Sequence, residues 1–191
     1  MKSLVEHLTE STVNEARVTA SDETLWTPTA TLRTTIPFLS TPAKALRKKI
    51  VKRMNEQGSD CDLNDLDISK VTDMSYLFFG LDFEGDISKW KTSKVDNMGS
   101  MFEHSEFNGD ISKWDVRRVK VMHHMFASSK FDGDISKWNV SNVYNMNCMF
   151  EKSQFTGDLS KWDTKSLEEC SGIFRNSPLE DNPPSWCHCD K

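Results

Sequence analysis

Residues 131–150 read FDGDISKWNVSNVYNMNCMF, and variants of this string recur along the chain at a constant step of 24 residues. A degenerate copy begins at Ser59, and a broken copy begins at Leu179 and places Trp186 in the column of the repeated tryptophans. A fixed internal period outweighs any local motif, because it is the signature of a repeat architecture. The array therefore spans about residues 59–186, with atypical units at both ends, as expected of caps that face water on one side. The full copies begin at Phe83, Phe107, Phe131 and Phe155.

The apolar columns of the repeat predict its structure when they are numbered from zero at the phenylalanine. Columns 4, 7 and 9 read I-x-x-W-x-V, the spacing at which a leucine-rich repeat carries a short strand. Columns 12, 15, 18 and 19 follow the spacing of one helical face. We therefore expect an α/β repeat: a leucine-rich-repeat-like solenoid of about five to six units, each a short parallel strand plus a helical turn. Glycine in column 2 predicts a turn with positive φ.

The period also separates core positions from candidate sites. A methionine stripe can bind metal or flexible peptides, but methionines that recur at the repeat step are expected to be core. The serine column has no histidine at a repeating position, so it predicts no catalytic nucleophile. The aspartate column is interpreted as turn-forming, with a calcium ladder as the alternative. The predicted core column contains Met74, Met98, Met122, Met146 and Cys170.

The repeat F-x-G-D-I-S-K-W-D-V-S-N-V-x-N-M-x-x-M-F is similar to that of BspA-like leucine-rich-repeat surface proteins, and the same repeat is abundant in mycoplasma surface lipoproteins. The resemblance covers about two thirds of the chain. It implies a solenoid used for binding or adhesion rather than an enzyme. Those surface proteins carry export signals or lipid anchors, and neither is evident here, so surface display is not expected.

The first ten residues, MKSLVEHLTE, resemble the capsid-targeting leader of internal head proteins of T-even-type phages. The resemblance implies cleavage after Glu10 and packaging into a virion. The alternative is an amphipathic helix over residues 1–17. Together these expectations give a cytoplasmic or virion-associated protein.

Composition excludes several classes of protein. The net charge of −5 gives no general argument for nucleic acid as a partner, and no apolar run approaches eighteen residues. The five cysteines are odd in number and irregularly spaced, so without a secretion signal we expect free thiols rather than a disulfide framework. The tail WCHCDK, residues 186–191, suggests a zinc or copper site, with terminal disorder as the preferred alternative. No catalytic residue, bound metal or cofactor is therefore predicted.

Four segments are expected: an N-terminal helix and extended linker over 1–40, a basic amphipathic capping helix over 41–58, the repeats over 59–186, and a tail over 187–191. In the capping helix Thr41 is the expected N-cap, Pro42 suits the first turn, and Gly58 can end it. Its basic residues could bind an anionic partner, with a solvated face as the alternative. They include Lys44, Arg47, Lys48 and Lys52.

Function in a repeat protein is expected where exposed positions depart from the consensus. The segment WDVRRVKVMHHMF, residues 114–126, departs most. It predicts a basic, histidine-bearing surface for an anionic macromolecular partner, with drift in a solvated loop as the alternative. Its two histidines are adjacent in sequence, so they should point apart and not share one metal ion. We therefore expect a non-enzymatic protein-binding module, or alternatively an internal virion protein. The residues of this surface are Arg117, Arg118, Lys120, His123 and His124.

Overall fold

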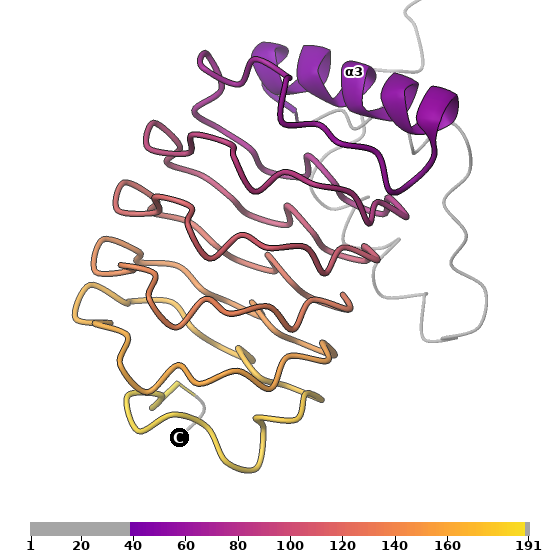
Figure 1. Ribbon diagram of the computed structural model, residues 1–191. Helices are drawn as coiled ribbons and strands as arrows, with labels where there is room; N and C mark the ends of the chain where they lie inside the picture. The colour runs from indigo at the N-terminus through magenta and orange to yellow at the C-terminus, as the bar shows by residue number, and fades with distance from the viewer. Residues whose placement is uncertain (1–38, 190–191) are drawn as a thin grey trace, which may run out of the picture.

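A computed structural model describes residues 39–189 as one helix followed by a stack of coils (Figure 1). The helix, α3, spans Thr41–Gln57 and is the only helix in this described range. It lies across one end of the stack, and the C-terminal end of the chain lies at the other (Figure 1). No helix within the described range is long and apolar enough to cross a membrane.

The predicted α/β unit of a strand plus a helical turn is wrong. Between residues 39 and 189 the structure contains no strand, only isolated parallel bridges between successive coils. The segment expected to be helical is built from β-turns instead. Ser100 in that segment has a φ value of 54°, which a right-handed helix does not allow. The bridges join Asp62 to Asp86, Asp73 to Asn97, Asn97 to Val121, Val121 to Asn145, and Asn145 to Glu169.

Hydrogen bonds between coils take the place of helical hydrogen bonds. Every second backbone N–H in columns 15 to 21 donates to a carbonyl of the following coil. In the second coil, for example, the N–H of Met98 donates to Val121 at 2.9 Å and that of Phe102 to Met125 at 3.0 Å. Turns within each coil supply the remaining bonds, such as Met101 N–H to the carbonyl of Met98 at 3.3 Å. A positive φ at the third residue, here Ser100, is what a type II turn requires.

Stacked aromatic columns form the core. Phe107 lies 6.2 Å from Phe131 between ring centroids, with an interplanar angle of 4°, and the column-19 phenylalanines stack in the same way. Each repeated tryptophan donates its Nε1–H to a carbonyl in the preceding coil, as Trp138 does to Ile111 at 3.1 Å, and all of them are buried except Trp186, which is half-buried. The same bond joins Trp90 to Leu63, Trp114 to Ile87, Trp162 to Ile135 and Trp186 to Leu159.

The methionine column is buried, as predicted, whereas Cys170 in the same column is only half-buried. The four column-2 glycines do not have positive φ, so their predicted role is wrong. They are small because the repeat phenylalanine folds over them. A Cβ on Gly109 would lie 2.7 Å from the ring of Phe107 and 3.3 Å from the carbonyl oxygen of Gly85.

Helix α3 covers the first coil with a buried stripe that includes Leu46 and Ile50. Ser40, not Thr41, is its N-cap, while Pro42 lies in the first turn as predicted. Gly58 ends the helix with φ of 100°, and its N–H donates to the carbonyl of Met54 at 2.9 Å. A positive φ at this position suits glycine, as the sequence indicated.

Candidate functional site

A basic groove crosses three successive coils. It is open to solvent, has a volume of about 520 Å³, and contains three of the residues predicted to bind a partner. The departures of residues 114–126 from the repeat consensus therefore identified part of the groove lining. The residues that line the groove are Asp96, Arg117, Arg118, Lys120, Asn142 and Tyr144.

Backbone pairing between coils fixes the positions of these side chains. The N–H of Lys120 donates to the carbonyl of Asp96 at 2.8 Å, and that of Tyr144 donates to the carbonyl of Lys120 at 3.0 Å. The amide of Asn142 donates to the carbonyl of Arg117 at 2.7 Å. Residues 24 apart in sequence are thus neighbours on the groove wall, and the groove does not depend on a long loop.

The charges of the groove are unequally available. Arg117 donates to both carboxylate oxygens of Asp115, at 2.9 and 2.7 Å. These hydrogen bonds lower the pKa of the Asp115 carboxyl and raise the pKa of the Arg117 guanidinium. Arg118 and Lys120 are exposed, and the groove they line also contains Asp96. Because Arg117 is already paired with Asp115, Arg118 and Lys120 are the cations best placed to meet an acidic partner.

Tyr144 gives the groove an apolar component. It is 38% exposed, and it is the one exposed large hydrophobic residue in the described part of the chain. Sequence reasoning missed it, and it missed Asn142 and Asp96 as well. The signal was available, because Tyr144 occupies the same column as Lys120 one coil later.

The two predicted histidines do not line the groove. His123 and His124 are half-buried, and their ring centroids lie 5.7 Å apart at an interplanar angle of 85°, so the two rings meet edge to face rather than pointing apart as predicted. His124 instead lies beside Cys148 and Glu151. The single basic, histidine-bearing surface that the sequence suggested is therefore two separate groups of residues.

On the capping helix, Lys44, Lys48 and Lys52 are exposed, and Lys52 lies 3.7 Å from Glu56. Arg47 does not belong to this surface, because its side chain is 1% exposed. The helical spacing is consistent with this burial, because Arg47 follows the buried Ala43 by four residues and so lies on the same face of α3.

Arg47 donates three hydrogen bonds to backbone carbonyls of the first coil: Tyr76 at 3.1 Å, Leu77 at 2.7 Å and Phe79 at 2.9 Å. In later coils, the carbonyls equivalent to those of Leu77 and Phe79 accept N–H groups from the preceding coil. Burial lowers the pKa of Arg47 to about 10, which leaves the guanidinium charged at neutral pH. It therefore has a structural role at the end of the stack.

The aspartate and serine columns form turns. Asp134 accepts hydrogen bonds from the hydroxyl of Ser136 at 2.7 Å and from its backbone N–H at 3.0 Å. These bonds lower the pKa of the Asp134 carboxyl. The backbone N–H to Asp bond recurs at Ser88, Ser112 and Ser160. These turns account for the repeated Asp-x-Ser string by a structural role, with no need for a catalytic one.

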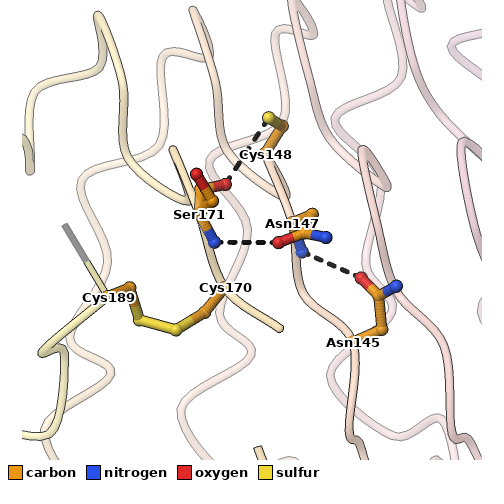
Figure 2. Close-up of a disulfide and its surroundings, with 6 residues drawn as sticks. All are labelled: Asn145, Asn147, Cys148, Cys170, Ser171 and Cys189. Atoms are coloured by element: carbon orange, nitrogen blue, oxygen red, sulfur yellow. Dashed lines mark hydrogen bonds between the residues drawn. A yellow bond between two sulfur atoms is a disulfide. The ribbon is translucent and has the colours of Figure 1, made fainter. Parts of the chain in front are cut away.

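The cysteines depart from the expectation of free thiols. Cys170 and Cys189 form a disulfide with a Cα–Cα distance of 5.4 Å, so that expectation is wrong for these two residues (Figure 2). The disulfide uses one of the three potential metal ligands of the tail. The other three cysteines, Cys61, Cys148 and Cys187, form no disulfide.

The expected leader, its cleavage position at Glu10 and the segment over 1–38 lie outside the described residues. The structure therefore places the candidate residues of the repeats and of α3 only.

Comparison with known protein families matches the part of the chain that contains the repeats. Residues 48–151 and 127–186 match the family described as "Mycoplasma protein of unknown function, DUF285". Together the two matches cover most of the chain, and the chain belongs to this family. The relationship agrees with the resemblance to the mycoplasma surface repeat, but it supports neither a phage leader nor a specific BspA-like protein. No curated protein and no solved structure matched the chain.

Proposed function

We propose that this protein is a non-enzymatic binding module whose basic groove holds an acidic segment of a protein partner. The groove carries the proposal: it places Arg118 and Lys120 on one coil beside Tyr144 on the next, and the backbone of Tyr144 is hydrogen-bonded to that of Lys120. Exposed cations attract a segment rich in carboxylates, and a tyrosine at the same surface adds apolar contact.

The architecture favours recognition over catalysis. The aspartates and serines of the repeat are paired with each other in turns, in four equivalent copies. A catalytic site needs one nucleophile with one base, whereas a stack of coils offers a long, preformed surface. Preformed backbone also lowers the entropy lost on binding.

Fluorescence anisotropy tests the proposal with a fluorescein-labelled deca-glutamate peptide and a labelled Gly-Ser peptide of equal length. We expect saturable binding of the acidic peptide alone, weakening as salt screens the charges. The triple variant R117E/R118E/K120E should lose at least about tenfold in affinity, since each reversed rim charge adds repulsion.

The matched control is K44E/K48E/K52E, which makes the same change in net charge on the exposed face of α3. It should bind the peptide nearly as well as the wild type. Equal losses in both triple variants would show that net charge alone attracts the peptide. That result, or retained binding by the groove variant, would refute the groove as the binding surface.

A further inference from the structure

His124, Cys148 and Glu151 form a cluster of three chemically different donors away from the groove. A ring nitrogen, the thiol sulfur and a carboxylate oxygen all lie within 4.8 Å of one another. All three residues are half-buried, so the cluster is held by its surroundings yet open to an ion from solvent.

The backbone fixes this juxtaposition. His124 and Cys148 occupy the same column in adjacent coils and share an unusual conformation, with φ of 53° and 54°. Their N–H groups donate to the following coil, to Asn147 at 2.9 Å and to Ser171 at 3.0 Å. The N–H of Glu151 closes a turn onto the carbonyl of Cys148 at 3.1 Å, which sets the third donor relative to the second.

Neighbouring amides hold the coil that carries the thiol (Figure 2). The N–H of Asn147 donates to the side chain of Asn145 at 3.0 Å, and the side chain of Asn147 accepts the N–H of Ser171 at 2.8 Å. The Cys148 thiol donates to the carbonyl oxygen of Ser171 at 3.6 Å, so the sulfur lies close to the backbone of the following coil.

We propose that His124, Cys148 and Glu151 bind a zinc ion. Three atoms this close have a point within about 2.8 Å of all of them, against zinc bond lengths of about 2.0–2.3 Å. Small side-chain rotations close the difference. A nitrogen, sulfur and oxygen donor set suits zinc, whereas calcium and magnesium require oxygen ligands. Three protein ligands leave a fourth position for water.

The charges around the cluster permit this assignment. Arg175 lies 3.6 Å from Oε1 of Glu151, and one such contact leaves the second carboxylate oxygen for the metal. The next residue in the histidine–cysteine column is Gly172, which has no side chain to block the thiol.

Cobalt titration of the full chain, under anaerobic conditions and without added thiol, tests the site. We expect one equivalent of Co²⁺ to produce a thiolate-to-cobalt absorption band, and stoichiometric Zn²⁺ to remove it. Cys148→Ser and His124→Ala should each weaken cobalt binding by more than about 100-fold, beyond the effect typical of outer-shell substitutions. Glu151→Gln should weaken it by at least about tenfold.

The tail provides the control, because it is a second source of thiol and imidazole. The variants Cys187→Ser and His188→Ala should keep the band. If the wild type gives no band, or if folded Cys148→Ser keeps it, the assignment is wrong. Loss of the band in the tail variants would instead place the metal at the C-terminus, and this result remains decisive even if the cluster variants do not fold.

Discussion

Substituting Arg47 by methionine removes the group that ends the hydrogen-bonded ladder of the coils. Methionine is similar in length and suits a helix, so the propensity of α3 changes little. What is lost is the guanidinium, which donates to the carbonyls of Tyr76, Leu77 and Phe79 at 2.7 to 3.1 Å. The first coil would then bury carbonyl groups that have lost their donor.

The expected loss of stability follows from these three bonds. A hydrogen bond to a charged group contributes about 1.5–3 kcal/mol, which gives an upper figure near 5–9 kcal/mol. Two of the three bonds are only partly buried, and methionine avoids the desolvation of a buried charge. We therefore expect Arg47→Met to lower the free energy of unfolding by about 3 kcal/mol.

Urea unfolding measured by two probes tests this value. Far-UV circular dichroism at the helical band reports mainly on α3 among the described elements, and tryptophan fluorescence reports on the buried indoles of the coils. Lys48→Met is the control, because Lys48 is exposed next to Arg47, and its effect should stay within about 0.5 kcal/mol. If Arg47→Met matches Lys48→Met by both probes, the structural role of Arg47 is refuted.

Two further predictions concern the repeat. Gly109→Ala should destabilise the fold by about 1–3 kcal/mol, because its Cβ would lie 2.7 Å from the buried ring of Phe107; an unchanged thermal midpoint would contradict this. The pKa of Asp134 is lowered in the folded state, so the stability it provides is present above about pH 4 and is lost as pH falls further. Asp134→Asn should keep the turn at neutral pH and reduce the acid-induced loss seen in urea midpoints, since Asn139 accepts the same type of bond from the N–H of Ser141 at 3.1 Å. An acid profile identical to that of the wild type would rule out this contribution.

The sequence predicted which residues are buried better than it predicted their local structure. Met98 and Met101 are separated by three residues, the spacing of a helical face. The same spacing arises when a four-residue turn brings both ends to the core, and the structure shows that turn. Periodicity alone does not separate the two, because the deciding factor is the pairing of N–H groups between coils.

The glycines show a similar limit. Both a positive φ and a close neighbour require glycine, and the sequence pattern is the same in either case. Here the ring two residues earlier is decisive: it leaves no room for a side chain on Gly109. The disulfide could not be predicted either, because it depends on the tail returning to Cys170 in space.

The candidate sites were predicted only in part. Comparing successive copies singled out Arg117, Arg118 and Lys120, and the structure places these three in one groove. The same comparison did not find Cys148 as a neighbour of His124, although both lie in one column. In a stacked repeat, residues one period apart touch, so reading down a column predicts contacts that reading along the chain does not.

Each type of bond between coils joins the same pair of columns throughout the array, from the backbone ladder to the indole of each tryptophan. A whole unit of 24 residues can therefore be removed or duplicated and every remaining residue still meets its usual type of partner. A change of any other length would shift aromatic rings onto polar columns. The length of the stack can thus change in steps of one coil. Such a step alters the distance between a given residue and the capping helix, while the contacts within and between the coils stay the same.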